Sequence, residues 1–223
     1  MKLYCSLFLI FLLSACGHNK KGDVVQDAMS LQGNVDAGRL LYNNTCKTCH
    51  GEMAEGNKKF LAPTLTNIND WYLYRQLMNY RNGIRGYDAH DTLAFQMAAM
   101  AKTLKDSIAV HDLVAYIKIL PGVKVETAIA GDIKNGKSIY QSICGSCHGP
   151  NASGNEKLNA PRLSGLNDWY LKEQIFKFKK SIRGAHPNDK LGAQMISMMA
   201  MLPDDQSIND VIGYMLSVKQ DSK

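Results

Sequence analysis

The chain has 223 residues, of which 45% are hydrophobic and 21% are charged, and its formal net charge is +6. These values are ordinary for a globular protein, and they exclude a chain that is disordered over most of its length. The length is compatible with one large domain or with two domains of about 100 residues each. The modest positive charge gives no support for nucleic-acid binding.

The first element that we expect is an export signal over residues 1–15. Lys2 precedes an apolar run, residues 7–13, that is too short to span a bilayer. The run ends in Leu-Ser-Ala-Cys, which resembles the lipobox of bacterial lipoproteins, whose processing leaves the cysteine, here Cys16, as an acylated N-terminus. An ordinary signal cleaved nearby is the alternative. With several acyl chains on Cys16 and residues 16–33 as a polar tether, the protein would be held on the periplasmic side of a bacterial membrane.

The rest of the chain is a tandem repeat with an offset of 98 residues. "TCKTCHG" at Thr45–Gly51 returns as "ICGSCHG" at Ile143–Gly149, and "NDWYL" at Asn69–Leu73 returns unchanged at Asn167–Leu171. The repeat predicts three segments: a first domain over residues 34–121, a linker over residues 122–131 and a second domain over residues 132–220.

Each repeat is predicted to be helical, and no segment alternates as a half-buried strand would. A first helix is expected from about Val35 into Cys46, and its partner from about Ile133 into Cys144. The Asn-Asp pairs that open "NDWYL" are suited to capping and predict the start of a middle helix. Apolar residues at positions i, i+3, i+4 and i+7 predict a last helix in each repeat, around Val110, Leu113, Val114 and Ile117, and around Ile208, Val211, Ile212 and Met215. The expected fold class is all-α.

Each repeat contains two cysteines separated by two residues and followed directly by a histidine. They are Cys46, Cys49 and His50 in the first repeat and Cys144, Cys147 and His148 in the second. A zinc site or a redox-active dithiol also uses cysteines at this spacing, but neither explains the histidine. C-x-x-C-H is the attachment signature of c-type haem, in which two thiols form thioethers with the porphyrin and the imidazole binds the iron. We therefore expect two covalent c-type haems.

The second axial ligand of each iron is expected among the methionines near the end of each repeat. Only two methionine pairs are preserved under the 98-residue offset, Met97 with Met195 and Met100 with Met198. The unmatched Met199 and Met201 are accordingly expected to be core filler. A thioether is a soft ligand, and combined histidine and methionine ligation raises the reduction potential of a haem.

The motifs occur in a recognisable order. Two C-x-x-C-H units are each followed by an Ala-Pro pair, by "WYL" and a glutamine, by an "RG" segment, and by "M..M...L" before a last helix that ends in Tyr116 or Tyr214. In this order the chain resembles the dihaem cytochrome c4 family over about residues 33–218. The resemblance implies two tandem class I cytochrome c domains, packed so that their haems exchange electrons. It implies Met97 and Met195 as iron ligands, with Met100 and Met198 as the alternatives.

The function that the resemblance implies is that of a monomeric electron carrier between membrane-bound respiratory donor and acceptor complexes, with no catalytic residues. The alternative is a dihaem enzyme, such as a peroxidase or a thiosulfate-oxidising enzyme, or the haem subunit of a larger oxidoreductase. An enzyme needs an open axial position on one iron, and the presence of a methionine in both repeats favours the carrier.

Pairs of residues that repeat at the same offset have predicted roles around the haems. Pro63 and Pro161 are expected to hold a loop whose carbonyl accepts the free N–H of the ligand histidine, with a simple turn as the alternative. Arg85 and Arg183 either pair with haem propionates or lie on the surface. The aromatic residues are expected to pack against haem or at the domain interface: Trp71, Tyr72, Trp169 and Tyr170.

The histidines outside the C-x-x-C-H motifs lack a histidine at the matching position of the other repeat, which argues against a ligand role. His90, His111 and His186 are therefore expected to be solvated. One basic group could attract an acidic redox partner or could be the solvated face of a helix: Lys172, Lys177, Lys179 and Lys180.

Overall fold

The computed structural model describes residues 33–218, which lie within one compact unit. In this part of the chain all regular secondary structure is helical, apart from two isolated β-bridges, so the expected all-α class is confirmed. No helix among the described residues is long and apolar enough to cross a membrane. The expected signal over residues 1–15, the acylated Cys16 and nearly all of the tether lie outside the described residues.

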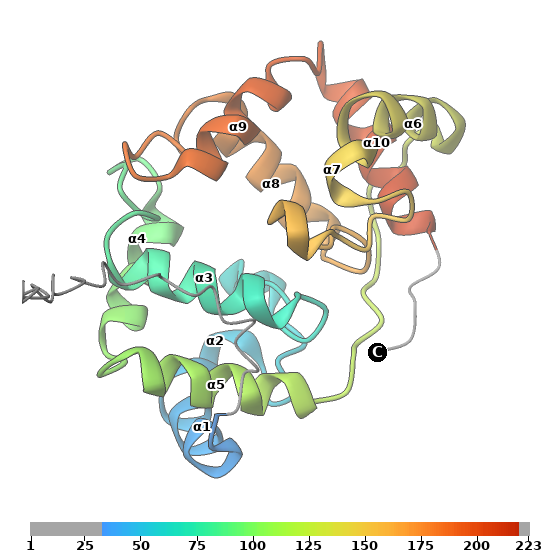
Figure 1. Cartoon of the computed structure of the whole chain (residues 1–223). Helices are drawn as coiled ribbons and strands as arrows, with labels where there is room; N and C mark the ends of the chain where they lie inside the picture. The colour runs from blue at the N-terminus through green and yellow to red at the C-terminus, as the bar shows by residue number, and fades with distance from the viewer. Residues whose placement is uncertain (1–32, 219–223) are drawn as a thin grey trace, which may run out of the picture. The chain divides into compact units, whose positions relative to one another are not determined.

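The two repeats contain the same series of helices (Figure 1). The first repeat has α1 (Val35–Leu41), a π-helical turn (Tyr42–Cys46), α2 (Lys47–His50), a 3₁₀ turn (Lys58–Phe60), α3 (Asp70–Arg81), α4 (Thr92–Lys102) and α5 (Ser107–Ile119). The second repeat has α6 (Ile133–Ile139), a π-helical turn (Tyr140–Cys144), α7 (Gly145–His148), a 3₁₀ turn (Glu156–Leu158), α8 (Asp168–Lys179), α9 (Lys190–Met199) and α10 (Asp205–Ser217). The predicted first, middle and last helices are all present.

The first and last helices of each repeat cross at a glycine. A Cβ atom on Gly38 of α1 would lie 1.9 Å from the carbonyl oxygen of Asp112 on α5, and one on Gly136 of α6 would lie 1.9 Å from that of Asp210 on α10. Because no side chain fits in so small a space, only glycine lets these helix backbones approach so closely. The close crossing fixes the helix that leads into each C-x-x-C-H motif against the last helix of the same repeat.

The core of each repeat forms along the predicted apolar face of its last helix. Val110 and Val114 on α5, and Ile208 and Ile212 on α10, are completely buried. Burial of one such side chain contributes about 1.5–3 kcal/mol to folding. The periodicity of the last helix therefore identified the core residues correctly.

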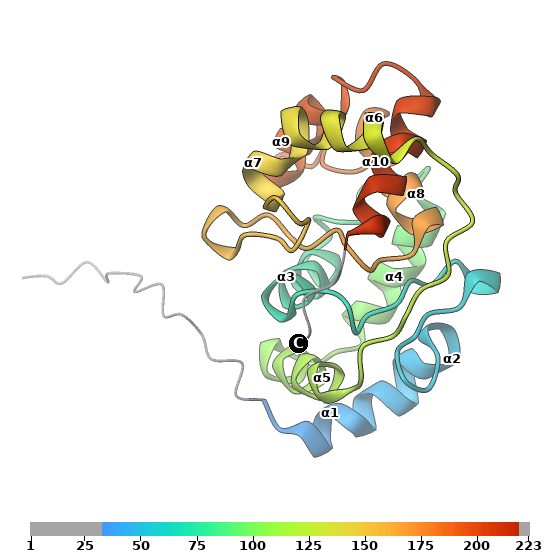
Figure 2. The ribbon, with the colours of Figure 1, turned by 90° about the vertical axis from the view of Figure 1, so that its right-hand side faces the viewer.

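The linker between the repeats is an extended stretch that runs from the end of α5 to the start of α6 (Figure 2). The side chain of Asn67 donates a hydrogen bond to the Val123 carbonyl at 2.7 Å, and the buried Asp168 carboxylate accepts one from the Ile129 N–H at 2.9 Å. Side chains of both repeats thus hold the linker in place.

The predicted start of the middle helices is confirmed, and Asn69 and Asn167 occupy the N-cap positions, but they do not cap the helices through their side chains. Helices α3 and α8 begin directly after these residues, but neither side chain makes a capping hydrogen bond. The Asn69 side chain instead accepts a hydrogen bond from the Arg162 N–H at 2.6 Å, and the Asn167 side chain accepts one from the Thr64 N–H at 2.9 Å. Each asparagine satisfies a backbone N–H of the other repeat, and this reciprocal pair of bonds gives the interface an approximate two-fold symmetry.

Candidate functional site

The C-x-x-C-H motif spans the end of the first helical segment in each repeat. The π-helical turn brings the chain to Cys46, and α2 ends at His50 before Gly51, whose φ of 86° favours glycine. The hydroxyl of the fully buried Tyr42 donates to the Gly51 carbonyl at 2.6 Å, and Tyr140 makes the matching bond to Gly149 at 2.7 Å. A buried tyrosine therefore fixes the backbone directly after the histidine of each motif.

The four cysteines of the two motifs form no disulfide with one another. Burial raises the pKa of Cys46 and of Cys144 to about 12, with a further increase from the second cysteine of each motif. A redox-active dithiol requires a thiol with a depressed pKa, so this environment argues against dithiol chemistry. Within residues 33–218 no three His, Cys, Asp or Glu side chains gather as a metal site, so the two cysteine pairs do not meet as the alternative zinc site.

The histidine of each motif is buried and held by one hydrogen bond. Its Nδ1 lies 2.8 Å from the Pro63 carbonyl oxygen for His50, and 2.7 Å from the Pro161 carbonyl oxygen for His148. Because a carbonyl can only accept, Nδ1 carries the proton and the lone pair of Nε2 is left for a metal. Burial lowers the pKa of both histidines, which keeps them neutral. The predicted role of the proline loops is confirmed, and the accepting carbonyls belong to the prolines themselves.

The loop between histidine and proline turns back on itself to make this bond possible. The Gly56 N–H donates to the His50 carbonyl at 2.8 Å, and the Asn57–Ala62 bridge closes a short hairpin before Pro63. Gly56 has a φ of 90°, and a Cβ there would lie 2.6 Å from the Thr64 nitrogen. The second repeat has the same arrangement around Gly154, so both proline carbonyls are positioned by local backbone structure.

The methionine side chains of the two candidate pairs differ in how deeply they are buried. Met97 on α4 is partly buried and packs against the first core, whereas Met100 is 42% exposed. In the second repeat both Met195 and Met198 pack against the core. The geometry therefore favours Met97 over Met100 in the first repeat, and the repeat then indicates Met195 in the second.

The core-filler prediction holds for one of the two unmatched methionines. Met199 is buried in the second core, but Met201 is 57% exposed, so its assignment as filler is wrong. Met201 follows the end of α9 at Met199 and so lies outside the helical face that carries Met199 into the core.

Arg85 and Arg183 are buried between the repeats, so their predicted surface alternative is wrong. Arg85 donates hydrogen bonds to Gln76 of its own repeat at 2.8 Å and to Gln174 and Tyr170 of the other repeat at 3.0 and 3.2 Å. Arg183 makes the reciprocal set, with Gln174 at 2.6 Å, Tyr72 at 2.7 Å and Gln76 at 3.0 Å. The interface role expected of Tyr72 and Tyr170 is therefore confirmed.

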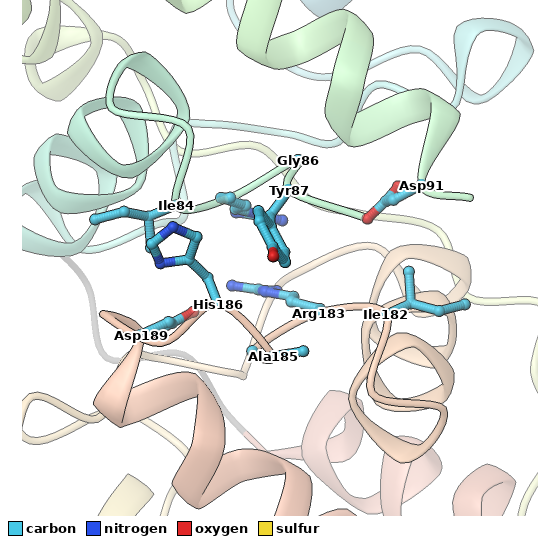
Figure 3. A pocket seen from close by; sticks show the side chains of 11 residues that line it. Ile84, Gly86, Tyr87, Asp91, Ile182, Arg183, Ala185, His186 and Asp189 are labelled. Carbon is cyan, nitrogen blue, oxygen red and sulfur yellow. The ribbon is translucent and has the colours of Figure 1, made fainter. Parts of the chain in front are cut away.

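The arginine cluster, defined as Arg85 and Arg183 with their glutamine and tyrosine partners, lacks a negative charge. Neither guanidinium forms an ion pair within the described residues, and the buried Nε of Arg85 has no hydrogen-bond partner. Buried charges are normally paired, and guanidinium matches a carboxylate well. Figure 3 shows Arg183 beside the facing segments 84–87 and 182–186 of the two repeats. The chemistry of this cluster fits a haem propionate.

The expected solvation of the remaining histidines holds only for His90, which is exposed and bonds to Asp88. His111 is half-buried and stacks on Tyr74 with ring centroids 4.1 Å apart. His186 is also half-buried, and its ring meets Tyr87 of the first repeat edge-on at 4.8 Å. Both histidines contact an aromatic ring, and the comparison of the two repeats does not predict these contacts.

The basic group on α8 is neither a free docking patch nor a solvated face. Lys177 pairs with Asp91 at 2.7 Å and with Glu173 at 2.6 Å. Lys172 donates to Asn209 at 2.9 Å, and Lys179 donates to the Leu202 carbonyl. Three of the four lysines are thus engaged inside the fold, and only Lys180 is exposed.

Comparison with known proteins agrees with this arrangement. A family model described as cytochrome c matches residues 35–121 and again residues 133–219. The chain is 29% identical over 208 residues to a cytochrome c4 from Thiocapsa roseopersicina, a match that covers 87% of this chain and 98% of that protein. It is 27% identical over 207 residues to a thiosulfate dehydrogenase electron acceptor from Stutzerimonas stutzeri, covering 86% of this chain and 91% of that protein.

The structure of reduced recombinant cytochrome c4 from Pseudomonas stutzeri is also similar. It matches with a TM-score of 0.62 and 21% identity, covering 84% of this chain and 100% of that one. The expected fold of two tandem cytochrome c domains and the resemblance to cytochrome c4 are thereby confirmed.

Proposed function

Because the chain belongs to the cytochrome c family and is a cytochrome c4-like electron carrier with two covalent c-type haems, we propose that it connects respiratory redox partners at a membrane. The observation that carries this proposal is the completeness of both repeats. Each has the cysteine pair, a neutral buried histidine bonded to a proline carbonyl, and a methionine on the helix that precedes the last one. Two complete sets of ligands favour transfer of electrons over catalysis at an open iron.

The proposed haem residues are the same in both repeats. Cys46 and Cys49 form the thioethers of the first haem and Cys144 and Cys147 those of the second, while the iron ligands are His50 with Met97 and His148 with Met195. The domains that hold them span residues 34–121 and 132–220, joined by the linker over residues 122–131. Each bound haem supplies reversible one-electron chemistry at its iron.

The protein's own residues keep that chemistry free of side reactions. The histidine–proline bond fixes the imidazole ring and its tautomer, which raises its strength as a ligand. Leu104 and Leu202, both nearly fully buried, close the end of each methionine segment before the last helix. Apolar surroundings of this kind limit the access of water and influence the reduction potential.

The alternative is a dihaem enzyme or the haem subunit of a larger oxidoreductase, and a relative named as the electron acceptor of a thiosulfate dehydrogenase supports the second of these. The two proposals differ in whether an axial position is open. The ferric holoprotein should therefore be mixed with cyanide and its visible spectrum followed. Little binding to either haem supports the carrier, whereas fast and complete binding to one haem supports an enzyme or a haem subunit of a larger oxidoreductase.

The arginine cluster provides a test of the proposed propionate contact. Replacement of Arg85 by glutamine removes a buried positive charge, so the ferric state gains relative stability and the reduction potential should fall. The shift should exceed that from Arg39→Gln, because Arg39 is exposed and pairs only with the exposed Asp36, at 3.1 Å. Potentiometric titration of the three proteins measures the difference. Equal potentials for Arg85→Gln and Arg39→Gln would contradict the propionate assignment.

We also propose that Cys16 is lipidated and holds the protein on the periplasmic side of a bacterial membrane, where it works as a monomer without nucleic-acid partners. The lipobox-like Leu-Ser-Ala-Cys sequence after a short apolar run supports this proposal. Mass spectrometry of the N-terminal peptide of the exported protein tests it. A peptide that begins with acylated Cys16 is the expected result, and an unmodified N-terminus elsewhere would refute the anchor.

A further inference from the structure

Helix α4, which carries Met97, begins at a buried carboxylate. Asp91 is the N-cap of this helix, and its Oδ1 accepts a hydrogen bond from the Ala94 N–H at 3.0 Å. The Asp91 backbone carbonyl also accepts from the Phe95 N–H at 2.8 Å. A cap of this kind fixes the first turn of a helix, and Met97 lies in the next turn. The position of Asp91 therefore influences where the Met97 thioether lies.

Asp91 is held by a residue of the other repeat. The Lys177 Nζ on α8 lies 2.7 Å from Asp91 Oδ1, and the two side chains are only 13% and 5% exposed. Glu173, one turn earlier on α8, lies 2.6 Å from the same Nζ and orients it. A buried pair of this kind is strongly coupled, because loss of one partner leaves the other charge buried and uncompensated.

The second repeat lacks the corresponding pair. Asp189 caps α9 through the Gly192 N–H at 2.8 Å, but the position that matches Lys177 is Asn79. Asp189 is half-buried and forms no ion pair within the described residues. Arg75, which matches Glu173, attracts Asp189 only without direct contact and donates its hydrogen bonds to Asn159. Figure 3 shows Asp91 and Asp189 on opposite sides of the region between the repeats. The cross-repeat ion pair is therefore one-sided.

We propose that Lys177 is a positioning residue for Met97, through which the second domain holds the axial-ligand helix of the first domain, with no equivalent in the other direction. The proposal rests on the proposed ligation of the first iron by Met97. It predicts that the first haem loses its methionine ligand more easily than the second when the contact between domains is weakened. The two haems of this carrier would thus differ in how easily an added ligand displaces the axial methionine.

The test uses the full-length holoprotein with Lys177→Asn, which reproduces the residue found at the matching position 79. All variants carry Met195→Leu as well, so that the remaining far-red band of ferric, thioether-ligated haem belongs to the first repeat. We expect the imidazole affinity of the first ferric haem to increase roughly tenfold to a hundredfold, the range typical for loss of a residue that supports a metal ligand. Lys177→Arg should restore most of the difference.

The matched control is Lys180→Asn, which removes the same charge from the end of the same helix at an exposed position. It should bind imidazole as the parent protein does. If Lys177→Asn also binds as the parent does, the positioning role is refuted, provided that Met97→Leu removes the remaining far-red band. If Met97→Leu leaves that band in place, the proposed ligand is wrong, which is a separate failure.

A second variant guards against loss of folding. Asp91→Asn with Lys177→Asn keeps a side chain suited to capping α4 and leaves no unpaired charge at position 91, while the Glu173 carboxylate, whose side chain is 29% exposed, loses its partner but keeps access to solvent. This double variant should still show the raised imidazole affinity, because the ion pair between Lys177 and Asp91 is removed. A parental affinity in the double variant would overturn the proposal.

Discussion

Replacement of Met97 by leucine is expected to lower the reduction potential of the first haem and to open its iron to added ligands. The thioether stabilises the reduced iron, and leucine fills similar space without a donor atom. A fall on the order of 0.1 V or more is expected, within the roughly 0.8 V that axial ligands can span. Potentiometric titration should show one component shifted and the other in place, and the far-red charge-transfer band should lose about half of its intensity, because one of two contributing haems is changed.

The matched control for this change is Met100→Leu. Met100 lies on the same helix but is 42% exposed, so its replacement should leave both potentials and the far-red band unchanged. Met195→Leu and Met198→Leu form the corresponding pair in the second repeat, where both side chains pack against the core. A loss of the band in Met100→Leu with none in Met97→Leu would mean that the ligands had been assigned to the wrong methionine pair.

Replacement of Cys46 and Cys49 together by alanine is expected to reduce the covalently bound haem from two groups to one. Both thiols of the first motif are needed for its thioethers, and the second motif is independent because its cysteines lie in the other repeat. Haem staining after denaturing electrophoresis, with quantification of haem per chain, measures the change. The first repeat should also lose most of its resistance to urea, because the haem proposed to pack against Met97 would be missing from its core.

Two further proteins complete that experiment. Cys144→Ala with Cys147→Ala should give the same haem content with the loss in the second repeat. Thr48→Ala changes the first motif without removing a thiol and should keep two covalent haems. Two haems per chain in the Cys46 and Cys49 double variant would show that these cysteines are not the attachment site.

The features that the sequence predicted correctly are those set by neighbouring residues or by the repeat. The C-x-x-C-H motif contains its own geometry, because Cys46, Cys49 and His50 lie within two turns of helix. The last helix could be identified because burial follows a 3.6-residue period along one face. The bond from His50 to the Pro63 carbonyl was also predictable, since one compact loop of 12 residues joins them.

The features that the sequence did not predict depend on contacts between the repeats. Asn69 has the residue type and position of a helix cap, yet its side chain accepts a hydrogen bond from the Arg162 N–H. Arg85 could be assigned to a surface or to a propionate, and only the fold placed it among Gln76, Gln174 and Tyr170. The preservation of Gln76 at position 174 was a signal of this contact, because a polar residue kept in both repeats can serve a shared interface.

The ion pair of Lys177 is another contact between the repeats that the sequence did not predict. The sequence placed it in a basic group on one helix, but its partner Asp91 lies 86 residues away in the other domain. No local pattern connects these two residues, and the repeat could not help because Asn79 stands at the matching position. Contacts that break the symmetry of a tandem repeat are visible only once the two copies are packed together.

Both irons are proposed to be closed by a histidine and a methionine. The most direct test is the visible spectrum of the oxidised wild-type holoprotein, with the intensity of the far-red charge-transfer band compared with the total haem content. An intensity that corresponds to two methionine-ligated haems per chain is the predicted result. An intensity that corresponds to one would refute the ligation of both irons by methionine, because one iron would then be open or have a different ligand.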